Sequence, residues 1–138
     1  MKVEFQTFLD KLLVVTDVAA FRNIIQIVVY NAMEYTKEGG SIRISLEAKA
    51  ASFLFAVQDS GIGIPANEQE HIFEKFVRAA NARLFKTDGT GLGLYTVKKA
   101  VELLEGSIRF ESEENKGSIF YVELPLRVEA RKGEVELI

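Results

Sequence analysis

An aspartate followed by two glycines ends an alternating apolar segment in the middle of the chain. Phe53, Phe55 and Val57 share one parity with Asp59, so in a strand the carboxylate emerges beside three large apolar side chains. A carboxylate in such surroundings needs hydrogen-bond donors. The exocyclic amino group of adenine is such a donor, and the glycines of residues 59–64 (Asp-Ser-Gly-Ile-Gly-Ile) would let the backbone approach a flat ring. The alternative is a strand that ends in a glycine turn with an Asx cap, and the motif alone leaves both open.

A second glycine cluster opens a helix further along the chain. Residues 88–94 are Asp-Gly-Thr-Gly-Leu-Gly-Leu. Alternating glycines expose successive backbone N–H groups, and a helix N-terminus adds partial positive charge, so phosphate is the natural ligand. The segment is not a Walker A loop, because no Gly-Lys-Ser/Thr follows, and it lacks the glycine that the Rossmann spacing needs at Leu94 or Thr96. The alternative is a flexible start to a helix.

Further polar side chains could complete a nucleotide site. Asn31, near the end of a long predicted helix, offers an amide oxygen of the kind that completes a magnesium shell, although by itself it is better explained as a polar helix end. Arg78, Arg83 and Lys86 place three cations in a segment that could fold over a polyphosphate. A solvated basic loop is the alternative, more so for Arg83 than for the other two. His71, near two phenylalanines, is interpreted as a surface or packing residue.

Composition excludes several other classes of function. The chain has 138 residues, enough for one domain, and a net charge of -3, which gives no general electrostatic footprint for nucleic acid. It has no cysteine and one histidine, which excludes disulfides, zinc–thiolate sites, a cysteine nucleophile and a multi-histidine metal site. No apolar stretch approaches the roughly 20 residues that cross a bilayer, and the N-terminus has no signal-peptide pattern. We therefore expect a soluble, cytoplasmic domain without direct membrane contact.

The elements that must position these residues follow from hydrophobic periodicity. Strands are predicted at residues 3–8, 12–16, 41–47, 53–59, 107–112 and 118–124, and helices from residue 16 or 17 to 35, at 67–76 and at 91–104. Residues 77–88 show no period and are predicted to be a loop. Consecutive hairpins imply a mixed, largely antiparallel sheet with helices on one face, an α/β two-layer sandwich. We expect the domain to span residues 1–125 and the charged tail, residues 126–138, to have no clear partner.

The order of four motifs resembles that of one known family. Residues 31–36 (Asn-Ala-Met-Glu-Tyr-Thr), 59–65 (Asp-Ser-Gly-Ile-Gly-Ile-Pro), 72–76 (Ile-Phe-Glu-Lys-Phe) and 89–94 (Gly-Thr-Gly-Leu-Gly-Leu) resemble, in this order, the four boxes of the ATP-binding catalytic domain of bacterial sensor histidine kinases. Each box alone is weak, whereas four in series are very specific. The resemblance covers residues 17–124 and implies the two-layer fold shared with gyrase, the Hsp90 chaperones and the mismatch-repair ATPases.

The resemblance also implies roles for individual residues. Asp59 would bind the adenine amino group, Asn31 would hold Mg²⁺, and residues 78–88 would form a lid over ATP. Phe73 and Phe76 would anchor that lid. The residues that the resemblance and the motifs together assign to nucleotide binding are Tyr35, Asp59, Gly61, Gly63, Ile64, Arg78, Lys86, Gly89, Thr90, Gly91, Leu92, Gly93 and Leu94.

Two positions depart from the family pattern. Ile27 stands where a second asparagine is usual, and where hydrolysing relatives carry a glutamate that activates water, so autonomous ATP hydrolysis is not expected. Glu34 stands where a basic residue is common, and a carboxylate there would repel phosphates unless Lys37 or Lys86 compensates.

The predicted partners follow from the same resemblance. Because the first predicted strand begins at Val3, the acceptor histidine is expected on a separate dimerisation domain, with a response regulator downstream and the catalytic domain itself monomeric. The chain would then be an excised fragment or a module that acts in trans. The alternatives are a degenerate module that binds nucleotide or a partner protein without transfer, and a serine kinase of the anti-sigma-factor type.

Overall fold

A five-stranded mixed sheet forms the centre of the protein. The computed structural model describes residues 1–86, 89–128 and 134–136. The strand order is β1 (Lys2–Thr7), β3 (Ser41–Ala48), β4 (Ser52–Asp59), β6 (Gly117–Pro125) and β5 (Ser107–Glu113). β1 is parallel to β3, and the other neighbours are antiparallel. This arrangement confirms the predicted mixed, largely antiparallel sheet.

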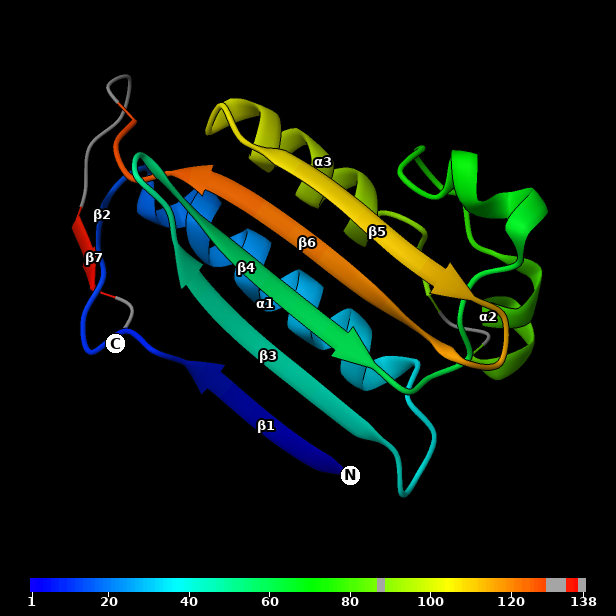
Figure 1. Cartoon of the computed structure of the whole chain (residues 1–138). Coiled ribbons are helices and arrows are strands. Elements are labelled where there is room, and N and C mark those ends of the chain that lie inside the picture. Colours follow the sequence, from blue (N-terminus) through cyan, green and yellow to red (C-terminus); the bar gives the residue numbers. More distant parts are fainter. Residues whose placement is uncertain (87–88, 129–133, 137–138) are drawn as a thin grey trace.

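Two long helices cover one face of this sheet. α1 (Val18–Glu34) and α3 (Gly93–Leu103) lie behind it in Figure 1. The Asp17 side chain caps α1 by accepting a hydrogen bond from the Ala20 N–H at 3.1 Å, which satisfies one of the free donors of the first turn. Apolar side chains at helical spacing along α1 are buried, among them Phe21, Ile24, Val28 and Ala32. The protein is therefore a two-layer sandwich in which a layer of helices packs on one face of the sheet, as the sequence pattern predicts.

The period of two places alternate side chains of β4 in the core. Phe53, Phe55 and Val57 are buried, and Asp59 follows on the same side at the end of the strand. Asp59 pairs with Ser118 at the start of β6. β4 is the central strand of the sheet, so the Asp59 carboxylate lies at the end of the sheet between two neighbouring strands.

The segment between the two glycine clusters differs from the prediction in two respects. Residues 67–76 do not form one helix; a 3₁₀ helix, η1, spans Ala66–His71, and Phe76 has a positive φ of 67°. Residues 77–88 are not entirely loop, because α2 (Ala80–Phe85) interrupts them, while residues 87 and 88 lie outside the described residues. Six residues with an exposed Leu84 carry no apolar stripe, so periodicity could not reveal this helix.

The C-terminal tail also contributes to the structure. We expected no partner for it, whereas β7 (Glu134–Glu136) pairs antiparallel with β2 (Leu13–Val15) to form a small second sheet. Val128 is buried in the core with 3% of its surface exposed, and its N–H donates to the Val15 carbonyl at 2.8 Å. Within the described ranges, no helix has both the length and the apolar character needed to span a bilayer.

Candidate functional site

A cavity of about 240 Å³ lies between the end of α1, the end of β4 and the segments that carry the glycines. This volume is just below the roughly 300–1,000 Å³ typical of ligand pockets. Twelve of the fourteen predicted site residues line the cavity: Asn31, Tyr35, Asp59, Gly63, Ile64, Arg78, Lys86, Gly89, Thr90, Gly91, Gly93 and Leu94. The four motifs, which lie between residues 31 and 94 of the sequence, thus meet at one place.

Asp59 is the buried carboxylate of this cavity, with 8% of its surface exposed. Its Oδ1 accepts a hydrogen bond from the Gly61 N–H at 2.9 Å, so the Asx turn is present. Burial raises the pKa of Asp59 above its usual value, and hydrogen bonds with the backbone of Gly61 and Ser118 only partly offset this. The carboxylate therefore caps the turn and also lines the cavity.

The first glycine segment is held in place by side chains from three elements. Asn81, in α2, donates to the Gly63 carbonyl at 2.9 Å. Ser112 Oγ accepts from the Ile64 N–H at 2.8 Å, and Gln69 donates to the Ile64 carbonyl at 3.0 Å. Gly63 has a φ of +67°, and an added Cβ would overlap the backbone carbonyl of Glu113. A glycine is required here for both reasons.

The second glycine segment packs tightly against its neighbours. Gly91 has a φ of +72°, an added Cβ would lie 2.7 Å from the Phe76 carbonyl carbon, and the Gly91 carbonyl accepts from the Phe76 N–H at 2.9 Å. A Cβ on Gly93 would lie 3.3 Å from Ile27 Cγ2. Ile27 therefore lies directly beneath the predicted phosphate segment, as an apolar support.

The two phenylalanines of residues 72–76 have different surroundings. Phe73 is partly buried against the core and packs edge-on against Phe110, with ring centroids 5.8 Å apart. Phe76 is 67% exposed, which contradicts the expectation that its side chain anchors the lid. The backbone of Phe76 is bonded instead to the segment that follows the lid, because its N–H donates to the Gly91 carbonyl.

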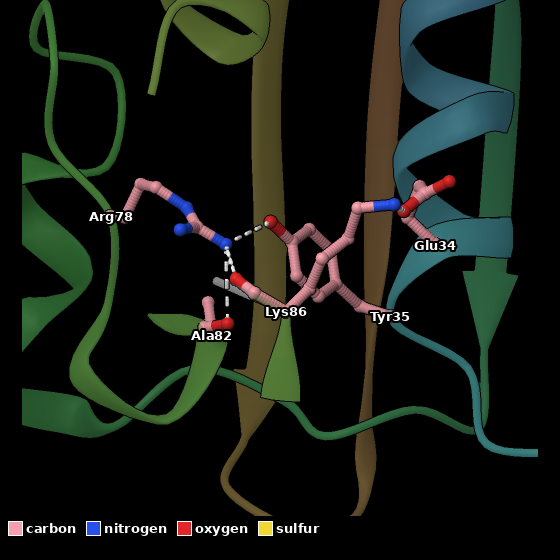
Figure 2. A network of polar contacts seen from close by, with 5 residues as sticks. All are labelled: Glu34, Tyr35, Arg78, Ala82 and Lys86. Carbon is pink, nitrogen blue, oxygen red and sulfur yellow. Dashed lines mark hydrogen bonds and ion pairs between the residues drawn. The ribbon is translucent and has the colours of Figure 1, made fainter. Parts of the chain in front are cut away.

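The described part of the lid, residues 78–86, is bonded to the end of α1 (Figure 2). Arg78 Nη2 donates to the Tyr35 hydroxyl at 3.1 Å and to the carbonyls of Ala82 and Lys86. Lys86 Nζ forms an ion pair with Glu34. The lysine lowers the pKa of Glu34, with a further hydrogen bond from Tyr30, so this carboxylate is ionised at neutral pH.

The structure adds residues that the sequence could not assign. Gly61 and Leu92 do not line the cavity; Gly61 donates to Asp59, and Leu92 caps α3. The additional lining residues are Ile27, Tyr30, Glu34, Ile62, Ile72, Val77, Ala79, Ala82, Ser118 and Phe120. Ser118 and Phe120 reach the site through the pairing of β6 with β4, which no local motif signals.

The donor set fits a magnesium nucleotide better than a protein-held metal. In the part of the chain that is described, no cluster of three or more histidine, cysteine, aspartate or glutamate side chains could hold a metal ion. Asn31 lines the cavity and offers one amide oxygen. Mg²⁺ commonly takes most of its ligands from phosphate oxygens and water, so a single protein ligand is compatible with it.

Comparison with known proteins gives consistent matches. Residues 16–128 match the family described as "Histidine kinase-, DNA gyrase B-, and HSP90-like ATPase". The sensor histidine kinase RppB of Synechocystis sp. is 44% identical over 96 residues, covering 70% of this chain and 21% of RppB. The sensor protein CiaH of Streptococcus pneumoniae is 33% identical over 119 residues, covering 86% of this chain and 27% of CiaH. The chain thus spans only a small part of the length of these relatives.

Solved structures agree with the sequence relatives. The mycobacterial sensor histidine kinase MprB superposes with a TM-score of 0.78 at 28% identity, covering 91% of this chain and 84% of that one. The catalytic domain of histidine kinase ThkA gives a TM-score of 0.78 at 31% identity, with coverages of 92% and 81%. Both the family resemblance and the fold class predicted from the four motifs are confirmed.

Proposed function

Because this chain belongs to the histidine kinase-, DNA gyrase B- and HSP90-like ATPase family, we propose that it is the Mg-ATP-binding catalytic domain of a two-component sensor histidine kinase. It transfers the γ-phosphoryl group of ATP to a histidine on a separate dimerisation domain. The observation that carries this proposal is the shared cavity, in which a buried Asp59 faces two glycine segments and two lid cations. A full-length relative of this fold, ShkA, is described in complex with AMPPNP, at 26% identity and a TM-score of 0.72.

Each side of the cavity has a separate task in this proposal. Asp59 accepts a hydrogen bond from the adenine amino group, and Gly63, Ile64, Leu94 and Tyr35 surround the base. Backbone N–H groups of residues 89–93 bind phosphate oxygens, assisted by Arg78 and Lys86. Gly61 and Leu92 act indirectly, through the Asx turn and the start of α3. Asn31 would hold Mg²⁺, which neutralises phosphate charge when it is bound.

The acceptor comes from outside the chain. In the transfer, the bond from the γ-phosphorus to its bridging oxygen breaks, a P–N bond to the acceptor imidazole forms, and ADP leaves. Ile27 contacts the glycine segment but cannot act as a general base toward water, so transfer is favoured over hydrolysis. His71 is exposed, is bonded to Glu70 and Glu74, and does not line the cavity, so it is not the acceptor.

The proposed partners are the histidine-bearing dimerisation domain, of the same or another kinase chain, and a response regulator. The relatives RppB and CiaH are named as a sensor histidine kinase and a sensor protein, which supports this assignment. As an ATP-dependent domain it would act in the cytoplasm, and it would be a monomer by itself.

A transfer assay tests the proposal. The domain is incubated with γ-labelled ATP, Mg²⁺ and a purified dimerisation domain of a sensor kinase. Acid-labile, base-stable label on the dimerisation domain is expected, and Asp59→Asn should abolish it. Binding of ATP without any transfer would indicate the degenerate module, which Ile27 and Glu34 make the main alternative. Acid-stable phosphoserine on a partner would indicate the serine kinase.

A further inference from the structure

Both cations of the lid that line the cavity are bonded to adjacent residues at the C-terminal end of α1, its last residue Glu34 and its C-cap Tyr35. Arg78 donates to the Tyr35 hydroxyl at 3.1 Å, and Lys86 pairs with the Glu34 carboxylate (Figure 2). The two contacts connect residues that are 43 and 52 positions apart in the chain. They fix the lid at two points, one before α2 and one after it.

Hydrogen bonds within the lid connect the segment between these two contacts. Arg78 also donates to the carbonyls of Ala82 and Lys86, so the side chain that contacts Tyr35 holds both ends of α2 together. The guanidinium lies against the second glycine segment, since a Cβ on Gly89 would be 2.8 Å from its Cζ. Releasing Lys86 from Glu34 therefore frees one end of a connected segment.

The Glu34–Lys86 pair lies on the cavity wall and is only partly solvated. The Glu34 side chain is 19% exposed and that of Lys86 is 34% exposed, and both residues line the cavity. Tyr30, one turn earlier in α1, also bonds the carboxylate and holds it in place. A partly buried pair is screened less by salt than a surface pair, so this contact has an energetic effect that an exposed ion pair lacks.

We propose that Glu34 sets the preference of the site for polyphosphate over uncharged nucleoside, because it competes with the nucleotide phosphates for Lys86. This inference rests on the proposed function. Without nucleotide, Glu34 is the anionic partner of Lys86 and keeps the lid drawn over the cavity. A bound di- or triphosphate replaces Glu34 as an anionic partner of Lys86. Adenosine carries no phosphate and leaves the ion pair intact.

The exchange has a definite cost for charged nucleotides. Phosphate must replace an existing carboxylate contact, and the displaced carboxylate then stays near the phosphates as a like charge. Both effects weaken the binding of ATP and ADP relative to adenosine. Replacing Glu34 by glutamine removes both effects while keeping the side-chain shape, so it isolates the charge.

Calorimetric titrations with ATP, ADP and adenosine test the competition. Glu34→Gln should tighten ATP and ADP binding by roughly three- to tenfold and change adenosine binding less than about twofold. Lys86→Met should weaken ATP and ADP binding, and its effect should be larger in the Glu34→Gln background, where the Glu34 carboxylate no longer competes for Lys86. If Glu34 instead positioned Lys86 for phosphate, Glu34→Gln would weaken ATP binding and the Lys86→Met effect would shrink; either result overturns the proposal.

A matched control is available at the other end of the sheet. Glu123 pairs with Lys49 at 2.9 Å and does not line the cavity. Glu123→Gln removes a lysine-bound carboxylate and the same unit of charge, so it reports the effect of net charge alone. A tightening of ATP binding by Glu123→Gln equal to that of Glu34→Gln would show that net charge, rather than competition for Lys86, explains the change.

Hydrogen exchange tests the nucleotide-free contact separately. The amides of Arg83 and Lys86 donate to the carbonyls of Ala79 and Ala82 at 3.1 and 2.9 Å, so they report opening of α2. Both should exchange faster in Glu34→Gln without nucleotide, and unchanged rates would refute the contact. If Asp59→Asn weakens ATP binding but Glu34→Gln leaves it unchanged, the competition is refuted and the proposed function is not. A wild-type domain that binds none of the three ligands contradicts the proposed function and the competition together.

Discussion

In the proposed function, Asp59 serves nucleotide binding at the expense of the stability of the fold. Its carboxylate is buried at the end of the central strand, and burial raises its pKa because the charged form is poorly solvated there. A carboxyl whose pKa is raised in the folded state favours folding below its ordinary value and loses that contribution as the pH rises through the raised value. At neutral pH the ionised group therefore destabilises the fold that positions it.

Substitution of this carboxylate should separate binding from folding. In Asp59→Asn, the amide oxygen can still accept from the Gly61 N–H, but no charge is buried. We expect the melting temperature of the variant, relative to wild type, to increase as the pH rises from 3.8, the ordinary carboxyl value, to neutral. ATP binding at neutral pH should weaken by roughly 10- to 100-fold, because a charged acceptor is lost. A relative stability that falls over this pH range would contradict the assigned burial cost.

Two glycines with positive φ offer a matched pair for testing close packing. Gly39 has a φ of +83° with nothing within 4 Å of an added Cβ, whereas a Cβ on Gly63 would overlap the Glu113 backbone. Gly39→Ala should lower the free energy of unfolding by about 1 kcal/mol, the backbone cost alone. Gly63→Ala should cost at least about 2 kcal/mol more, since backbone must move. Equal losses in urea unfolding would show that crowding at Gly63 is relieved easily.

The strands and helices that bury one face were predictable from the sequence, because the buried face gives a periodic apolar pattern. A helix that buries no residue gives no such pattern. The strands around Ile44 and Val57 alternate because one face meets α1, and that alternation is visible in the sequence. α2 has no buried residue; Asn81 bonds it to the distant Gly63 carbonyl, and Arg78 donates to the carbonyl of Ala82 within it, and neither contact leaves a periodic signal.

The same distinction applies to the site. Glycines and carboxylates in fixed order predicted most of the cavity, because each motif is local. Ser118 reaches the cavity only because β6 pairs with β4 in one register, and the Glu34–Lys86 contact depends on where the lid folds. Such long-range contacts follow from the three-dimensional fold and cannot be derived from one sequence segment.

Shortened chains test how far the folded unit extends. A chain that ends at Pro125 lacks Leu126, which packs against the core, and the buried Val128. It should lose roughly 1.5–3 kcal/mol of unfolding free energy for the fully buried side chain, and further stability with Leu126. A chain that ends at Val128 keeps both of these side chains and loses, among the described contacts, the three-residue pairing of β7, so it should be affected less. Equal urea midpoints for the two would support a domain boundary at residue 125.

The domain as a whole should respond to its ligand as one cooperative unit. Ligand at 100 times its dissociation constant stabilises the folded state by about 2.7 kcal/mol. For a chain of this size, that corresponds to a rise in melting temperature on the order of 10 °C with ATP and Mg²⁺. Asp59→Asn should show little rise under the same conditions. Identical shifts in the two proteins, followed by differential scanning calorimetry, would place ATP binding outside the cavity.

The parallel pairing of β1 with β3 decides at which end of the sheet the first strand begins. The Lys2 N–H donates to the Gly40 carbonyl at 3.0 Å, and Ile42, two residues on, pairs with Asp59. β7 pairs with β2 at the far end of the sheet, beyond the start of β4 (Figure 1). The first residues of β1 therefore lie at the same end of the sheet as Asp59. A fluorophore or immobilisation tag for binding studies should accordingly not be joined ahead of Met1, where it would lie at the end of the sheet that carries this carboxylate.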